Sequence, residues 1–188
     1  ENGYWRLGVC EAEVASRRYV GATFVLETIW KGPGGTAHVT DFMPPGTDHA
    51  DLIRRVECLE GSVEVENDIE FRFEYGSRTP WVRLVTHGET EALLAVAGRH
   101  AVEVHGPTLW DGQECQEANQ SAGAATGRLR GLHRLDVGET ACWVMTWERS
   151  YVTMPQPGDP EELLADTLDF WNTWADQVAP APDTQPEY

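Results

Sequence analysis

The sequence predicts a mainly β protein, a large antiparallel two-layer β-sandwich followed by a C-terminal linker helix. Apolar and polar residues alternate along 62–75, which is typical of a long strand with one face on a core and the other in water. Further segments rich in aromatic and β-branched residues recur at intervals of roughly eight to twelve residues, with Gly and Pro turns between them. A helical pattern is seen near the C-terminus, over 160–177.

The individual strands follow from these patterns. Gly32-Pro33-Gly34-Gly35 predicts a hairpin turn, and Gly61 and Gly76 are expected as the turns that bound the long strand. Residues 140–147 are apolar on both faces, so a second layer should cover this strand. The expected strands are 4–9, 23–31, 37–43, 52–59, 62–75, 82–86, 92–97, 101–105, 128–135 and 140–147. Residues 106–127 have little periodicity and are expected to form an irregular excursion.

The predicted helix has clear start and stop signals. Asp159 suits the N-cap, Pro160 the first helical position and Glu162 a capping box. Leu164 and Leu168 begin an apolar stripe that ends in the aromatic cluster of Phe170, Trp171 and Trp174. Such a cluster needs a large apolar partner, either the sheet or a further domain. We therefore divide the chain into a sandwich at 1–155, a helical linker at 156–178 and a Pro-rich tail at 179–188.

The composition is that of a soluble globular protein. The chain has 188 residues, 14 Lys+Arg against 31 Asp+Glu, and a formal net charge of −17. This charge repels phosphate backbones and anionic lipids, which argues against nucleic-acid and membrane partners, whereas a neutral sugar feels no such repulsion. No apolar run approaches the roughly 20 residues that a membrane span requires.

The start of the chain and its cysteines indicate a cytoplasmic protein. No signal-peptide pattern opens the chain, although the missing initiator Met suggests that residues precede it. The cysteines are widely spaced and form no CxxC motif: Cys10, Cys58, Cys115 and Cys142. Three disulfide pairings are open to them, but free thiols in a reducing compartment are favoured.

The sequence shows no recognisable active site. Hydrolysis of a glycosidic bond takes two carboxylates, but most acidic residues have a simpler explanation as the solvated face of 62–75 or as part of the first turn of the helix. The histidines lack HxH and HExxH spacing, so we predict no metal site and no cofactor; His100, Glu103 and His105 are the alternative set. Trp110 beside Asp111 is a weak candidate for stacking on a sugar.

Several phrases occur in this order in one known group of proteins. They are SRRYVGATFVLETIW (16–30), VTDFMPPG (39–46), IRRVECLEGSVEVE (53–66), FRFEYG (71–76), PWV (80–82), LLAVAG (93–98) and DTLDFWNTWADQ (166–177). As an ordered set they resemble the N-terminal region of bacterial glycoside hydrolase family 15 proteins, the glucoamylase-like and trehalase group. The last phrase is similar to the helix that leads from that region toward the catalytic domain. The resemblance covers nearly the whole chain.

The resemblance implies a super-β-sandwich that supports a separate (α/α)6 catalytic barrel. In the family, two glutamates of that barrel hydrolyse an α-glucoside with inversion, so no catalytic residue is expected in this chain. The chain lacks the family's opening segment upstream of Glu1, so we expect an edge strand of the sheet to be missing. The aromatic residues proposed to contact the barrel are Tyr75, Trp81, Phe170, Trp171 and Trp174. The expected partners are that barrel, the α-glucoside it binds and a second copy of this chain, which the uncovered surface could bind.

Two other readings stay open. The chain could be a free-standing carbohydrate-binding module that stacks sugars on exposed Trp, or a small metal-dependent sandwich enzyme. The residues do not choose among trehalose, maltose and longer α-glucans.

Overall fold

Strands dominate the computed structural model, which describes residues 3–46, 48–87, 90–109 and 128–178. These residues form the strands β1 (Tyr4–Val9), β2 (Glu13–Tyr19), β3 (Leu26–Gly32), β4 (Gly35–Phe42), β5 (Ala50–Glu70), β6 (Trp81–His87), β7 (Thr90–Ala97), β8 (His100–His105), β9 (Arg128–Asp136) and β10 (Thr140–Arg149). The helix α2 (Pro160–Gln177) follows them. All the strand pairs are antiparallel, so the predicted fold class is confirmed.

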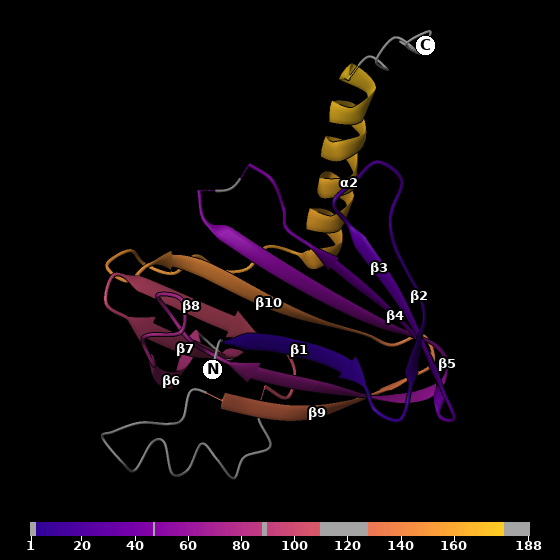
Figure 1. Ribbon diagram of the computed structural model, residues 1–188, viewed down its shortest axis with the longest axis horizontal. Coiled ribbons are helices and arrows are strands. Elements are labelled where there is room, and N and C mark those ends of the chain that lie inside the picture. Colours follow the sequence, from indigo (N-terminus) through magenta and orange to yellow (C-terminus); the bar gives the residue numbers. More distant parts are fainter. Residues whose placement is uncertain (1–2, 47, 88–89, 110–127, 179–188) are drawn as a thin grey trace, which may run out of the picture.

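The sheet forms two layers because β5 belongs to both (Figure 1). The first half of β5 lies between β4 and β10 in the order β2-β3-β4-β5-β10-β8-β7-β6. Its second half pairs with β1 and β9, which form the other layer. Gly61 lies between the halves at a φ of 71°, where a Cβ would lie 2.2 Å from the Gly34 carbonyl oxygen. The predicted turn at Gly61 is therefore wrong: the glycine lets one strand bend from layer to layer.

Two other strand predictions need correction. β2 was missed, and its seven residues are all exposed, so it has no buried face to create an apolar pattern. The long strand ends at Glu70 rather than Tyr75. A tight turn follows, in which the Phe73 N–H donates to the Arg78 carbonyl at 2.9 Å and Tyr75 has a φ of 57°.

The main core lies between the two layers. Val63, Val65 and Ile69 of β5 are almost completely buried there, opposite Val104 of β8 and Trp143 of β10. Asn67 interrupts this apolar face without leaving the core, because its side-chain oxygen accepts a hydrogen bond from the Trp5 indole at 2.6 Å. The alternation along 62–70 is thus confirmed as a core-facing pattern in which Asn67 occupies one of the buried positions.

One residue of the predicted solvated face is buried. Asp68 is only 5% exposed, since Tyr4 of β1 and Arg128 of β9 cover it from the two neighbouring strands. The Tyr4 hydroxyl and the Arg128 guanidinium both donate to its carboxylate. A central strand keeps a polar face dry when the side chains of its neighbours reach across it.

A second, smaller core lies on the outer face of the larger layer. Val25, Phe42, Ile53 and Val144 are buried there under the first turns of α2. This confirms that a further layer covers β10. The rest of the helix stands out beyond the strands (Figure 1).

Candidate interdomain surface

The start of α2 is held to the sheet by polar contacts. Asp159 caps the helix as predicted, and its carboxylate accepts from the backbone N–H groups of Glu161 and Glu162 at 2.9 and 3.1 Å. Arg55 of β5 donates to the Glu161 carboxylate at 2.6 Å and to Glu57 at 2.9 Å. Burial opposes the charge of Arg55, yet these two carboxylates raise its pKa above the ordinary value.

The first turns of the helix add apolar contacts. Leu163, Leu164 and Leu168 pack on the smaller core. Thr167 is fully buried between them, and its hydroxyl donates to the Leu163 carbonyl at 2.6 Å. These contacts fix the direction in which the remaining turns leave the sandwich.

The later turns carry aromatic residues that the sandwich covers only in part. Trp171 packs edge to face against Phe24, with ring centroids 4.5 Å apart, and also against Phe170 and Trp174. Phe24, Phe170 and Trp174 are 65%, 45% and 52% exposed. We call these four residues the helix aromatic surface. So large an apolar patch on a solvent-facing helix is typical of an interaction site.

A polar-rimmed groove continues this surface along the helix. It has a volume of about 430 Å³ and is lined by Asp166, Asp169, Phe170, Thr173, Trp174 and Gln177. The buried Trp171 indole N–H has no hydrogen-bond partner among the residues that the structure describes. Of the predicted contact residues, Phe170, Trp171 and Trp174 thus form one continuous surface.

The other two predicted contact residues lie elsewhere. Tyr75 is fully exposed at the turn after β5, beside a cleft of about 470 Å³ that Trp5, Phe73 and Met145 also line. Trp81 begins β6, is 55% exposed and has the Arg83 guanidinium 5.0 Å above its ring. β6 and β2 are the opposite ends of the sheet order. The structure therefore does not bring Trp81 to the helix aromatic surface.

Another aromatic groove was missed from the sequence. It has a volume of about 580 Å³ and is lined by Arg99, His100, Trp147, Arg149 and Tyr151. Trp147 and Tyr151 are 37% and 70% exposed, so their rings are available to a ligand. Trp147 ends the predicted strand 140–147, whose apolar pattern on both faces predicts a buried side chain at this position. The predicted stacking residue, Trp110, lies outside the described residues.

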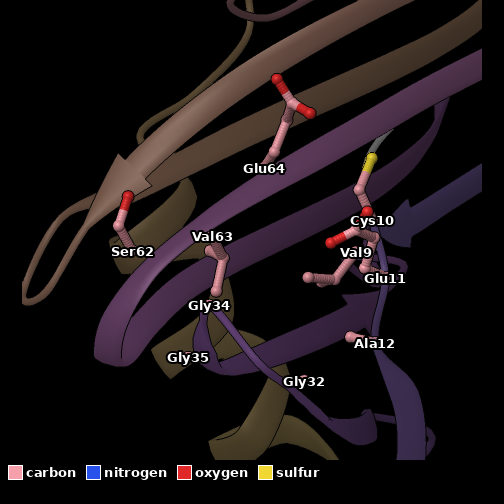
Figure 2. A pocket seen from close by; sticks show the side chains of 10 residues that line it. All are labelled: Val9, Cys10, Glu11, Ala12, Gly32, Gly34, Gly35, Ser62, Val63 and Glu64. Carbon is pink, nitrogen blue, oxygen red and sulfur yellow. The ribbon is translucent and has the colours of Figure 1, made fainter.

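A glycine-rich pocket of about 280 Å³ lies where β1, the hairpin after β3 and the bend of β5 meet (Figure 2). It contains two carboxylates, those of Glu11 and Glu64. In Figure 2 the Glu64 side chain points away from Glu11, so these two groups do not face each other as an acid–base pair must.

Comparison with solved structures places this architecture among known folds. The chain matches a bacterial glucoamylase crystallised with acarbose at a TM-score of 0.53 and 10% identity, over 94% of its own length. The chain shares the fold of part of that enzyme. A second match, described as a kojibiose phosphorylase from the human microbiome, has a TM-score of 0.40 and 8% identity over 82% of this chain.

This resemblance covers only part of each larger protein. The chain spans 29% of the length of the glucoamylase and 21% of that of the second protein. Comparison with protein families and with curated proteins gave no match. The glycoside-hydrolase-like sandwich expected from the sequence is thus supported at the level of the fold. No helix among the described residues is long and apolar enough to span a membrane.

Proposed function

We propose that this chain is the non-catalytic sandwich domain of a glycoside hydrolase that acts on α-glucosidic bonds and that it supports an (α/α)6 catalytic barrel. The observation that carries the proposal is the match of 94% of the chain to 29% of a bacterial glucoamylase. A part of such an enzyme should carry a surface for the remainder. The helix aromatic surface, at the end of the chain nearest to any following domain, is that surface.

In this proposal the barrel carries out catalysis and the sandwich does not. An inverting glycosidase needs two carboxylic acids roughly 6.5–9.5 Å apart on either side of the scissile bond. In this proposal both come from the barrel, while the sandwich provides a rigid base. The sandwich then affects the reaction by fixing the position of the barrel, whose substrate is trehalose, maltose or a longer α-glucan.

The first test compares the 188-residue chain with the longer protein encoded by the same gene. Each is incubated with trehalose, maltose and maltotriose, and released glucose is measured. We expect release by the longer protein and none by the 188 residues. Hydrolysis by the 188 residues alone, or a gene without a following region of paired helices, would refute the proposal.

The second test concerns the surface. Trp174→Glu places a charge in the helix aromatic surface, and Asn172→Glu adds the same charge on another face of the helix. Because Trp174 is already half exposed in this chain, neither change should lower the melting temperature of the 188 residues by more than a few degrees. In the longer protein, Trp174→Glu should lower the melting temperature by more than a few degrees, whereas Asn172→Glu should not. Equal effects in both proteins would show that Trp174 is a core residue and not an interface residue.

A carbohydrate-binding module is the second candidate, and the aromatic groove at Trp147 and Tyr151 favours it. Flat aromatic rings beside arginine donors can stack on and hydrogen-bond to a sugar. Titration with maltose or trehalose would then change the Trp fluorescence of the 188 residues, and Trp147→Ala would abolish the change. A flat titration would remove this candidate.

A further inference from the structure

Three potential metal ligands meet on the outer face of the larger layer. Glu103 and His105 are two residues apart on β8, so their side chains share one face of the strand. His87 ends β6 and reaches the same place from the other side of β7. The ligand atoms of the three side chains lie within 4.8 Å of one another. His100, which the sequence alternative included, faces the opposite side because it is an odd number of residues from Glu103.

The distances suit a common metal ion. Nε2 of His105 is 2.7 Å and Nε2 of His87 is 3.0 Å from the same oxygen, Oε1 of Glu103. In a tetrahedral site with bonds of roughly 2.0–2.1 Å, neighbouring ligand atoms are about 3.3 Å apart. The two His–Glu distances therefore lie within about 0.6 Å of this spacing, and the two histidine nitrogens, which are at most 4.8 Å apart, would move toward each other to admit an ion.

The small side chain of Ala92 on β7 leaves room between these ligands. Ala92 pairs with His105 on one side and with Val85 on the other, so its side chain faces the same way as the cluster. A methyl group at this position lets His87 approach β8 across the intervening strand. A larger residue at Ala92 would separate the two histidines.

Hydrogen bonding among the described residues leaves one atom of the cluster, His87 Nε2, without a partner. His105 and Glu103 form a buried hydrogen bond. His87 Nε2 is close to the same oxygen, but it is buried without hydrogen-bond geometry to any described residue. Glu103 is only 2% exposed, and a buried carboxylate needs a cation or donors to offset its lost hydration. A divalent cation would supply both the missing partner of His87 and the positive charge.

We infer that His87, Glu103 and His105 bind a divalent transition-metal ion, with Zn²⁺ the best match to two imidazoles and one carboxylate. The side chain of His87 is 30% exposed, which gives the ion a route from solvent. The ion joins the edge strand β6 to β8 across β7. Its role is structural, since it holds the exposed edge of the sheet in place.

The test uses the 188-residue chain, treated with a chelator and then titrated with Zn²⁺ against a chromophoric competitor. We expect one bound equivalent, a higher melting temperature with Zn²⁺ and slower amide hydrogen exchange in β6. His87→Ala and Glu103→Gln should each lower the affinity by at least about tenfold, because even outer-sphere partners of metal ligands contribute that much.

The matched control is His100→Ala, which removes a histidine from the other face of the same strand and should keep full affinity. Circular dichroism checks that each variant is folded, and His87→Ala is the variant expected to fold most readily because His87 is partly exposed at an edge. A site made by cysteine thiolates would survive His87→Ala. Absence of a Zn²⁺ equivalent, retention of binding in His87→Ala, or equal loss in His100→Ala would each overturn the inference.

Discussion

Arg55, in the middle of the sheet, donates a hydrogen bond at 2.6 Å to Glu161 in the first turn of α2. The two residues are 106 positions apart, and their contact joins the linker helix to β5. Arg55 is 14% exposed while Glu161 is 58% exposed, so water screens the acidic end of the pair. The relative strength of this ion pair and of the leucine contacts beside it decides what holds the helix in place.

We expect the leucines to dominate. Glu161→Gln should cost at most about 1 kcal/mol, because pairs this exposed to water contribute little and Arg55 keeps Glu57 as a partner. Leu168→Ala should cost more, about 1–2 kcal/mol, since it removes apolar area from the smaller core. Urea unfolding monitored by Trp fluorescence measures both, and Asn172→Glu is a control outside the contact. A larger loss in Glu161→Gln than in Leu168→Ala would contradict this order.

Asp68 should make the stability depend on pH. The hydrogen bonds from Arg128 lower the pKa of Asp68, and the Tyr4 hydroxyl adds to this effect, although burial opposes it. Because the pKa is lower in the folded than in the unfolded chain, the stabilisation is present above the unfolded pKa near 4 and is lost as the pH falls below it. Asp68→Asn should cost about 1–3 kcal/mol at pH 7, and this cost should shrink as the pH falls from about 4 toward the lowered pKa of the folded chain.

Urea unfolding of both proteins between pH 7 and pH 3 measures this difference. Asp136→Asn is a useful comparison, since the pKa of Asp136 is also lowered, first by a hydrogen bond with Ser62, but its side chain is 63% exposed. We expect a smaller pH-dependent difference there. A stability gap between wild type and Asp68→Asn that stays constant with pH would contradict the role given to the charge.

Gly106 should be sensitive to the addition of a side chain because it lies against the core. Its φ is 151°, and a Cβ there would lie 2.4 Å from Cδ1 of Trp143, which is fully buried and donates from its indole to the Pro107 carbonyl at 3.0 Å. Gly106→Ala should therefore cost about 2–4 kcal/mol, the sum of overpacking and backbone strain. Chemical denaturation measures the loss.

Gly138 provides the control because a side chain there would strain the backbone without overpacking the core. It has a φ of 83° in the turn between β9 and β10, and a Cβ there would meet nothing within 4 Å. Gly138→Ala should cost only the strain, about 1–2 kcal/mol. Similar losses for the two variants would show that Trp143 moves aside at little cost.

The sequence predicts the core better than the surface, for a physical reason. β5 has a buried side chain at every second position from Val63 to Ile69, and β10 is apolar on both faces because it lies between the main core and the smaller core. Both patterns are visible in the sequence. β2 buries no face, so its seven residues have no such pattern. A glycine such as Gly61 permits either a turn or a bend within a strand, and only the pairing of β5 with strands of both layers decides between them.

The candidate sites can likewise be predicted only where their residues lie on one element. That Glu103 and His105 share a face follows from their spacing alone. Their approach to His87 depends on the order β8-β7-β6 and on its register, which one sequence does not specify. Three members of the helix aromatic surface can be predicted from the sequence because Phe170, Trp171 and Trp174 lie on one helix. Its fourth member, Phe24, precedes a strand far away in the sequence.

Cys142 should react slowly with alkylating agents. Burial under the start of α2 raises the pKa of its thiol to about 11, and the carboxylates of Glu161 and Asp159 add to this effect while Arg55 opposes it. At pH 8 the thiolate fraction is then roughly 200-fold smaller than for a free thiol of pKa 8.5. The greater nucleophilicity of a more basic thiolate recovers about tenfold, so the net slowing is about twentyfold.

The pH dependence distinguishes this effect from simple shielding. The rate of iodoacetamide modification of Cys142, followed by mass spectrometry of its peptide, should rise about tenfold for each pH unit between 8 and 10. The same peptide in the urea-unfolded chain is the control, and its rate should level off above about pH 9. A folded-state rate that levels off at the same pH would mean that the thiol has an ordinary pKa and is only shielded. In that case the helix restricts access to Cys142 but does not change its chemistry.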